Sequence, residues 1–491
     1  MNSNRQHLLY VVLILLVGLG LRLYRINLPL LDAKPHREIH TAEVTRNFYW
    51  HDFNVFYTKT KLWGDEPGYY VLEFPLYNAL AVAPYAVFGH VDETWGKGIS
   101  VFSSLVLAIY FYLLVTRLFN KKVALWALAF FYLFSPQEIM LSRSFQPDQF
   151  GLMLAVASLY YFVRWTQEET VRYHVYSFLL LTVTLLVKVQ FFPVTFAMML
   201  LAIRKWKLHA FRNPLLLLYT FSLLPTLLWF YHVRMVYLQF PQLNGAHMLS
   251  VQNWSALENF INPHWYVNIF YDFTTQITTI PVFILACIGL FLKNRKNYQV
   301  IYAWMLGLFL FVLTYSVHIF FWYYQVPLLF PVVLLAAHAQ EAIVLRLHSV
   351  LLFPRLVVLM VVLLSMVLTA RPYLLRTYTI PDKHEYVLET ARYVRQLATA
   401  HSKIITSSYN SAALTYYSLR PDLWGATFVI NDPTCLGKCA IAEFEKLRGW
   451  GATLYAISDK RELTQNVDFA NYLTRFKPLV DNEHFIVYDI H

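Results

Sequence analysis

Charged residues, cysteines and nucleotide-binding motifs are scarce in this chain, and each scarcity removes a class of protein. Only 14% of the residues are charged, whereas 58% are hydrophobic and 18% aromatic, a composition typical of integral membrane proteins. Three cysteines exclude a disulfide scaffold and cannot supply a four-ligand zinc set. No GxGxxG or P-loop pattern follows a predicted strand, so nucleotide binding has no support.

The basic residues outnumber the acidic ones but do not indicate a nucleic-acid partner. The formal net charge is +11, and Lys and Arg form short clusters between apolar runs, as they do in cytoplasmic loops. A spanning helix needs about 20 apolar residues, and about eleven candidates are present. They lie near residues 8–24, 98–116, 123–141, 149–165, 174–188, 189–203, 214–231, 275–292, 298–316, 322–341 and 350–370. The first lacks a small-x-small cleavage site and is predicted to be an uncleaved signal anchor.

One further apolar run, residues 69–89, decides the topology. It is long enough to span but contains Glu73, Pro75, Asn78 and Pro84. If it lies in the outer interface as a juxtamembrane helix, the basic clusters all fall on the inner side, in agreement with the positive-inside rule. These inner residues are Arg5, Arg117, Lys121, Lys122, Arg164, Arg172, Arg204, Lys205, Lys207, Arg212, Lys293, Arg295, Lys296, Arg346 and Arg355. The N-terminus is then cytoplasmic.

The same topology gathers the polar segments on the outer side. We expect the following outside the membrane: the loop 25–97, the turn 142–148, Lys188, residues 232–273 and 318–322, and everything after about residue 371. The domains predicted are therefore a transmembrane domain, residues 1–371, and an extracytoplasmic α/β domain, residues 372–491.

The C-terminal domain has short strand and helix patterns and about 115 residues, enough for a small core. Strands are expected at 403–408, 452–457 and 485–489, and helices at 410–419 and 440–448. Cys435 and Cys439 either form a disulfide in an oxidising compartment or remain free thiols. The sequon Asn253-Trp254-Ser255 is a weak signal of glycosylation.

The first outer loop is the most polar part of the transmembrane domain. Residues 34–49 combine acids, bases and histidines in a helix-compatible run, and further polar groups follow at 65–68 and 73–75. Because nearly everything else is apolar, this gathering predicts a chemical centre at a membrane face. The alternative is a solvated loop whose charges only keep it out of the bilayer.

Five features occur in a fixed order along residues 1–345. They are Arg37-Glu38 followed by Ala42-Glu43-Val44-Thr45-Arg46; Glu73-Phe74-Pro75-Leu76; Arg143 with Asp148; Lys188; and His318 with Tyr323, Tyr324, Pro327 and Pro331. This series resembles the GT-C superfamily of membrane glycosyltransferases, in particular the protein O-mannosyltransferases and the aminoarabinose transferase that modifies lipid A. The resemblance implies an α-helical polytopic fold. It also implies transfer of a sugar from a polyprenyl-phosphate donor to a glycan, lipid or protein acceptor outside the cytoplasm.

One position departs from the family pattern. The family's loop usually begins with Asp-Glu, and its Asp is the favoured catalytic base, whereas Arg37 stands there in this chain. Glu38, Asp148 or Asp32 is therefore the candidate base, and Glu43 is a further catalytic candidate. A non-catalytic relative is the alternative.

The remaining candidates follow from what the implied reaction requires. An inverting transfer needs a carboxylate that accepts a proton and a cation that stabilises the departing phosphate. Lys188 is the phosphate candidate, with Arg37 and Arg143 in support, although a lysine at a membrane boundary often only snorkels. Glu73 and His318 either orient the substrate or cap the juxtamembrane helix. Tyr324 is a further substrate-binding candidate, and Asp148 is alternatively a helix N-cap.

A cofactor is not required by any motif. His36 and His40, beside Glu38 and Glu43, are candidate ligands of a divalent metal such as Mg²⁺ or Mn²⁺. The alternative is a pair of loop histidines beside acids without a metal.

Other functional classes remain open at this point. A transporter or flippase of lipid-linked sugars would place charges near the middle of its spans, and residues 98–116 and 298–316 contain none. A sensor or assembly protein would use the C-terminal domain to bind a partner. The single sequon and compact tail favour a bacterial inner membrane over an endoplasmic reticulum.

Overall fold

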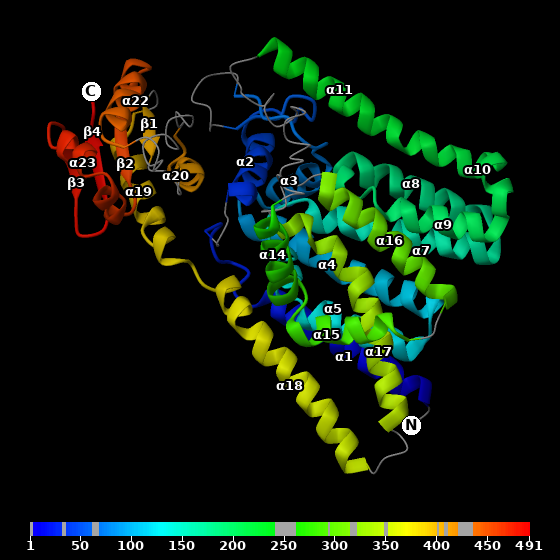
Figure 1. The fold of residues 1–491 in the computed structure, drawn as a ribbon. Coiled ribbons are helices and arrows are strands. Elements are labelled where there is room, and N and C mark those ends of the chain that lie inside the picture. Colours follow the sequence, from blue (N-terminus) through cyan, green and yellow to red (C-terminus); the bar gives the residue numbers. More distant parts are fainter. Residues whose placement is uncertain are drawn as a thin grey trace.

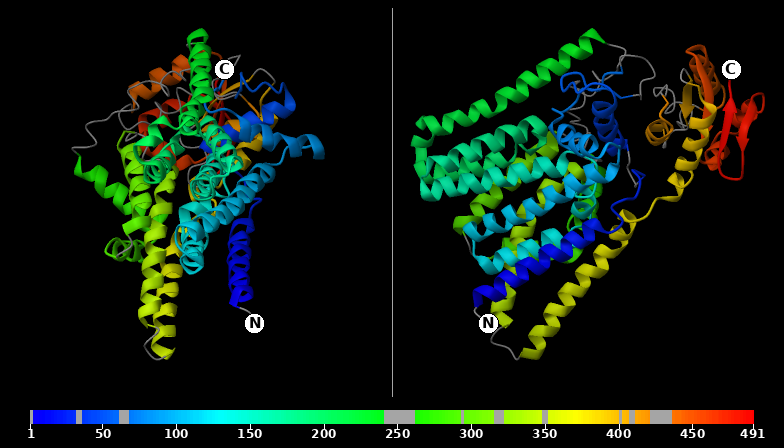
Figure 2. Two further views of the ribbon diagram at one scale, coloured as in Figure 1. Left: turned by 90° about the vertical axis from the view of Figure 1, so that its right-hand side faces the viewer. Right: turned by 180° about the vertical axis from the view of Figure 1, so that it is seen from behind.

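A bundle of long helices carries a small α/β domain at one end (Figure 1). The computed structural model describes residues 3–31, 36–60, 68–240, 262–292, 295–314, 322–347, 352–399, 402–406, 411–420 and 436–491. The chain begins at the end of the bundle far from the α/β domain, and α18 leads back to that domain (Figures 1 and 2).

The bundle consists of the apolar segments found in the sequence. Its helices are α1 (Ser3–Leu23), α4 (Glu93–Leu118), α5 (Lys121–Phe134), α6 (Pro136–Leu141), α7 (Asp148–Glu168), α8 (Val171–Val187), α9 (Val194–Trp206), α10 (Pro214–Leu217), α11 (Leu224–Gln239), α14 (Pro263–Asp272), α15 (Ile280–Leu290), α16 (Arg295–Thr314), α17 (Leu329–Leu347) and α18 (Leu352–Thr377). Among the described residues, five helices are long and apolar enough to span, and six if the bent pair Pro263–Ile277 and Ile280–Leu290 is one span. The number of about eleven spans therefore stays a prediction.

Prolines explain where predicted spans are interrupted. The span expected at 123–141 is divided into α5 and α6 at Ser135, which is extended (φ −103°, ψ 101°). Pro136 follows it, and a residue before proline is sterically disfavoured in the helical conformation. α14 and α15 are bent by 108°, with Pro281 in the first turn of α15.

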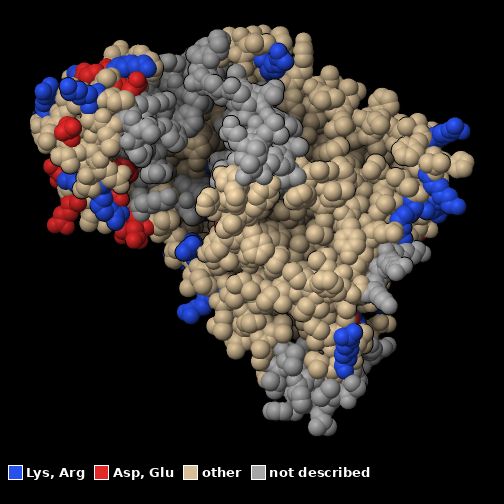
Figure 3. Space-filling view, viewed as in Figure 1, with Lys and Arg blue, Asp and Glu red and all other residues tan. Residues whose placement is uncertain are grey.

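The loops predicted for the inner side contact one another. Arg117 in the last turn of α4 pairs with Glu168, the last residue of α7, at 3.0 Å, and Lys205 of α9 pairs with Glu169 at 2.5 Å. Lys122 of α5 lies 3.8 Å from Glu341 of α17. These segments therefore share one end of the bundle. On the face shown in Figure 3, acidic residues are scarce on the bundle and gather on the C-terminal domain.

At the opposite end, two short helices of the first outer loop cover the bundle. α2 (His36–Trp50) confirms the helix expected in the polar run, and eleven of its residues are buried. α3 (Leu76–Phe88) confirms a helix within the juxtamembrane run and ends at Gly89, whose φ of 74° favours glycine. Asn78 of α3 donates hydrogen bonds to the Thr41 carbonyl and the Thr45 hydroxyl of α2, at 2.7 and 3.0 Å.

The C-terminal domain is built on a four-stranded sheet of order β1-β2-β4-β3. Its elements are α19 (Val387–Leu397), β1 (Lys403–Thr406), α20 (Ser411–Ser418), α22 (Lys438–Gly449), β2 (Ala452–Ile457), α23 (Val467–Leu473), β3 (Lys477–Asp481) and β4 (Ile486–Asp489). β1 and β2 are parallel, and the other pairs are antiparallel. The three expected strands are present. β3 is an exposed edge strand that contains Pro478, and its polar sequence gave no strand signal.

The two domains share a hydrophobic core. Ile39 of α2 and Tyr77 of α3 belong to the same buried cluster as Ala412 of α20 and Leu454 of β2. α18 also continues beyond the predicted boundary at residue 371 to Thr377. The boundary at 371/372 thus marks a change in the sequence pattern. In the folded protein, the first outer loop packs against the C-terminal domain. The predicted disulfide involves Cys435, which lies outside the described residues.

Candidate active site

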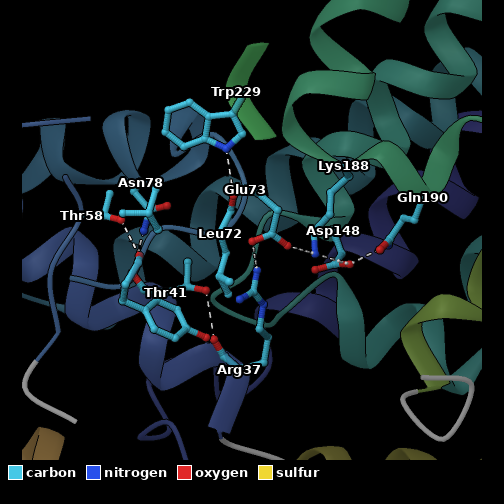
Figure 4. A network of polar contacts seen from close by, with 12 residues as sticks. Arg37, Thr41, Thr58, Leu72, Glu73, Asn78, Asp148, Lys188, Gln190 and Trp229 are labelled. Carbon is cyan, nitrogen blue, oxygen red and sulfur yellow. Dashed lines mark hydrogen bonds and ion pairs between the residues drawn. The ribbon is translucent and has the colours of Figure 1, made fainter. Parts of the chain in front are cut away.

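Four ionisable side chains from four separate segments meet in one network of polar contacts (Figure 4). Glu73 accepts hydrogen bonds from Arg37 of α2 and, at 2.6 Å, from the Lys188 ammonium. Lys188 also lies 3.3 Å from Asp148 Oδ1 at the start of α7. We call Arg37, Glu73, Asp148 and Lys188 the charged cluster.

Local breaks in the helices position three members of this cluster. Lys188 follows α8 in an extended conformation (φ −151°, ψ 91°), just before the short 3₁₀ helix η1 (Val189–Phe191). Asp148 is the first residue of α7, directly after Pro147. Glu73 precedes Pro75, where the extended chain turns into α3. Each side chain therefore extends from a helix end, which is where polar groups can reach a common point.

The charges of the cluster stabilise one another. Burial alone would raise the pKa of Glu73, but the cations of Arg37 and Lys188 outweigh it and lower that pKa to about 2. Burial opposes the charge of Arg37, yet Glu73 and neighbouring groups raise its pKa above the ordinary value. Glu73 and Arg37 therefore stay ionised at neutral pH.

Asp148 keeps one oxygen without a partner. Its Oδ1 accepts a hydrogen bond from Gln190 at 3.0 Å in addition to the Lys188 contact. Its Oδ2 is buried and has no hydrogen-bond partner among the described residues. Unsatisfied buried oxygens are rare and indicate a missing ligand or water. The simple N-cap alternative does not apply, since Asp148 lies inside the first turn and Pro147 occupies the cap.

His40 lines a cavity beside the charged cluster. This cavity, which we call the cluster cavity, is bounded by Arg37, His40, Thr41, Val44, Thr58, Tyr70, Leu72, Glu73, Phe74, Pro75, Asn78 and Pro147. His36 Nε2 and His40 Nε2 are 2.9 Å apart, and the His40 ring stacks on Tyr70. Burial and the Arg37 charge lower the pKa of His36 to about 4, so this histidine is neutral at pH 7.

Glu38 and Arg143 lie on the neighbouring side of α2. Glu38 Oε2 accepts a hydrogen bond from the backbone N–H of Phe145 at 2.7 Å. The Phe145 ring can approach the backbone of α4 closely because residue 96 is glycine. A Cβ at that position would lie 2.1 Å from the ring. Burial, with the charges of Glu38 and Asp148, raises the pKa of Tyr77. Both carboxylates therefore lie near one residue, at the same end of the molecule.

Glu43 lies on a different face of α2 from Arg37, because two residues six positions apart are far from alignment on a helix. It pairs with Arg46 at 3.3 Å. Arg46 in turn donates to the Tyr416 carbonyl of α20 at 2.8 Å and stacks on its ring at 4.0 Å. Glu43 thus belongs to the contact with the C-terminal domain, apart from the other catalytic candidates.

The last motif of the sequence is only partly described. His318 lies outside the described residues. Tyr324 contacts Tyr323, with ring centroids 4.6 Å apart, and the Lys188 ammonium lies 5.9 Å from the Tyr323 ring. Tyr70 and Gln190 were not among the predicted site residues. Gln190 lies two positions after Lys188 at the same helix break, and this spacing could have identified it as a site residue.

Comparisons with known proteins agree on the architecture. A family model described as dolichyl-phosphate-mannose-protein mannosyltransferase matches residues 66–232, and no curated protein matches the sequence. The structure of ArnT from Cupriavidus metallidurans bound to undecaprenyl phosphate has a TM-score of 0.60 and 15% identity, over 98% of this chain and 97% of ArnT. The archaeal oligosaccharyltransferase AglB from Archaeoglobus fulgidus, in complex with an inhibitory peptide and a dolichol-phosphate, has a TM-score of 0.63 and 11% identity. That match covers 97% of this chain and 73% of AglB.

The chain has the GT-C fold. The predicted polytopic helical fold with a small C-terminal α/β domain is therefore confirmed, as is an integral membrane location. At identities this low the similarity concerns the fold, and the chemistry of this GT-C protein has to be argued from its own residues.

The histidine pair His36 and His40 is the predicted binding site of a divalent metal. Among the described residues, no group of three or more His, Cys, Asp or Glu side chains could hold a metal ion. The carboxylates that the prediction placed beside the histidines contact Phe145 and Arg46 instead. Two imidazoles without carboxylate oxygens do not fit Mg²⁺ or Mn²⁺, which prefer oxygen ligands. We therefore derive no step through a metal.

Proposed function

We propose that this GT-C protein transfers a sugar from a polyprenyl-phosphate donor to an acceptor on the extracytoplasmic face of a bacterial inner membrane, with its N-terminus in the cytoplasm. The observation that carries the proposal is the charged cluster. Arg37, Glu73, Asp148 and Lys188 are far apart in the sequence, yet they meet beside a cavity at the outer end of the bundle.

The two cations are arranged to receive a phosphate. Arg37 and Lys188 both contact Glu73, so an anion taking the place of this carboxylate would meet both cations. Asp148 holds the Lys188 ammonium from the other side. In such a buried setting the Lys188 charge would stabilise the departing lipid phosphate more strongly than it could in water.

The chemical step requires a proton acceptor. The acceptor hydroxyl attacks the anomeric carbon, the bond from that carbon to the phosphate oxygen breaks, and its electron pair leaves with the phosphate. The hydroxyl proton goes to a carboxylate, for which Glu38 and Asp148 are the candidates, since the charges of both act on Tyr77. Attack opposite the leaving phosphate inverts the anomeric configuration.

The ligands bound in the similar structures support this proposal. ArnT is bound to undecaprenyl phosphate, and AglB is in complex with a dolichol-phosphate. A lipid-phosphate donor would also account for a site at the membrane face in a chain without a nucleotide-binding motif.

Turnover of a labelled donor tests the proposal. Purified protein in lipid nanodiscs receives a radiolabelled polyprenyl-phosphate sugar, and discharge of the sugar to an acceptor or to water is followed. We expect Lys188→Ala to lower the rate about 10²- to 10³-fold. Lys205→Ala is the matched control, because it removes a lysine paired with a glutamate at 2.5 Å at the other end of the bundle. Equal rates in the two variants would contradict the site.

A further inference from the structure

A short helix at the far end of α9 from Lys188 exposes apolar and basic side chains next to one another. This 3₁₀ helix, η2 (Lys207–Arg212), follows α9 directly. The chain turns sharply into it at Lys207, whose φ of 52° is uncommon for a residue other than glycine. The candidate membrane span Pro214–Gln239 begins immediately after it, so η2 lies where a span enters the membrane. Lys and Arg side chains gather at this end of the bundle, on the right-hand edge of Figure 3.

The faces of η2 differ in character. Side chains three residues apart lie on the same face of a 3₁₀ helix. Ala210 is buried in the hydrophobic core of the bundle, whereas Leu208 and Phe211 are 79% and 61% exposed on one common face. His209 and Arg212 are exposed on the next face. Large apolar side chains beside basic ones are typical of a segment that lies in the membrane interface, with the apolar side chains directed into the acyl region.

The two terminal cations of η2 have no carboxylate partner in the protein. Glu168 and Glu169 are the only acidic residues between positions 149 and 257. Both are already paired with other cations of the bundle, at 2.5 to 3.0 Å. Within the described parts of the chain, neither Lys207 nor Arg212 forms an ion pair. Their charges are therefore available to an anion from outside the protein.

We propose that η2 binds the headgroup phosphates of anionic phospholipids in the surrounding bilayer. Lys207 and Arg212 bind the phosphates, while Leu208 and Phe211 lie among the acyl chains. Lys207 and Arg212 are separated by about 10 Å along the axis of a 3₁₀ helix, so each can bind its own headgroup. Water around the same segment would leave two large apolar side chains hydrated, which the hydrophobic effect opposes. The proposal depends neither on the transferase reaction nor on the side of the membrane that this end faces.

Native mass spectrometry of the full-length protein tests the headgroup preference. The protein in detergent micelles is titrated with phosphatidylglycerol and phosphatidylcholine of the same chain length, and the bound fraction of each lipid is measured. A cation near an anionic headgroup strengthens binding about fivefold, so Lys207→Gln and Arg212→Gln should each lower the preference for phosphatidylglycerol by about that factor. The double variant Lys207→Arg with Arg212→Lys keeps both charges and should retain the preference. Arg392→Gln with Arg395→Gln, which removes two exposed arginines of α19, is the matched control and should also retain it.

Two further arms separate the lipid from a free anion and η2 from the charged cluster. Glycerol 3-phosphate has the phosphate but no acyl chains, so it should not displace phosphatidylglycerol, and displacement at equal concentration would overturn the lipid. α9 has 13 residues and keeps η2 about 20 Å from Lys188, so Lys188→Ala should leave the preference unchanged.

The outcomes that would overturn the proposal are distinct from a failure of the proposed function. Equal binding of the two lipids by the parent protein, or a preference lost in Lys188→Ala and kept in Lys207→Gln and Arg212→Gln, would show that η2 does not bind anionic headgroups. Failure of donor discharge would count only against the transferase, because lipid binding requires no turnover.

Discussion

Two groups of paired charges in the same protein differ in their access to a cavity. Arg22 of α1 and Glu138 of α6 form an ion pair whose side chains are completely buried. Arg22 also donates to the carbonyls of Gly18 and Tyr132 at 2.8 and 3.0 Å, and Gln149 donates to Glu138 at 3.0 Å. This pair ties α1, α5, α6 and α7 together.

The charged cluster, by contrast, faces open space. Arg37 and Glu73 line a cavity, and Asp148 retains an oxygen without a described partner. Neither Arg22 nor Glu138 lines the cluster cavity. A buried ion pair by itself is therefore weak support for a site, and access to a cavity separates a candidate active site from a structural contact.

Breaking the Arg22–Glu138 ion pair should have the largest effect, and this effect should be a loss of stability. Arg22→Met leaves the Glu138 carboxylate buried without its cation, which costs about 3–5 kcal/mol. Thermal unfolding in detergent measures the loss. The double variant Arg22→Met with Glu138→Leu removes both charges and should recover much of it. A single variant as stable as the parent protein would show that the pair does not hold the helices together.

In the charged cluster, a substitution should affect activity more than stability. Asp148→Asn keeps the shape but weakens the hold on the Lys188 ammonium, so we expect donor discharge to fall about 10²-fold with little change in melting temperature. Asp92→Asn is the matched control, because Asp92 caps α4 by accepting a hydrogen bond from the Thr94 amide at 2.8 Å. Comparable activity in both variants would remove the distinction between the two groups.

A third charged contact, outside the membrane bundle, should show an intermediate effect. Arg46→Met removes the contacts with Glu43 and Tyr416, and charge-assisted hydrogen bonds contribute about 1.5–3 kcal/mol. We expect the C-terminal domain to undock more often and limited proteolysis after α18 to accelerate. Arg461→Met, which breaks an exposed pair within that domain, should leave the cleavage rate unchanged.

The smallest effect should come from the histidine pair. Burial lowers the pKa values of His36 and His40, so the unfolded chain binds more protons than the folded protein below about pH 6.5. Stability should therefore decrease as the pH falls from 6.5 toward 4, while Glu73, with a pKa of about 2, stays ionised. Melting temperatures measured across this range should depend less on pH in a His36→Gln, His40→Gln double variant. An unchanged slope would contradict neutral histidines in the folded state.

Local sequence determined the elements of this protein. The polar run predicted α2, the apolar run with Glu73 and Pro75 predicted α3, and strand-forming residues predicted β1, β2 and β4, because each pattern acts over a few neighbouring residues. The segments predicted to lie on the inner side meet at one end of the bundle, while their orientation relative to the membrane stays a prediction.

Only the tertiary structure decided which charges meet. The sequence offered Glu38 and Glu43 as equivalent acids beside two histidines, yet one contacts the Phe145 amide and the other Arg46, which reaches Tyr416 in the C-terminal domain. Lys188 finds Glu73 and Asp148 across long separations that no local pattern encodes. Contacts of this kind depend on helix packing, and a rotation of one residue along α2 changes the cavity that a side chain faces.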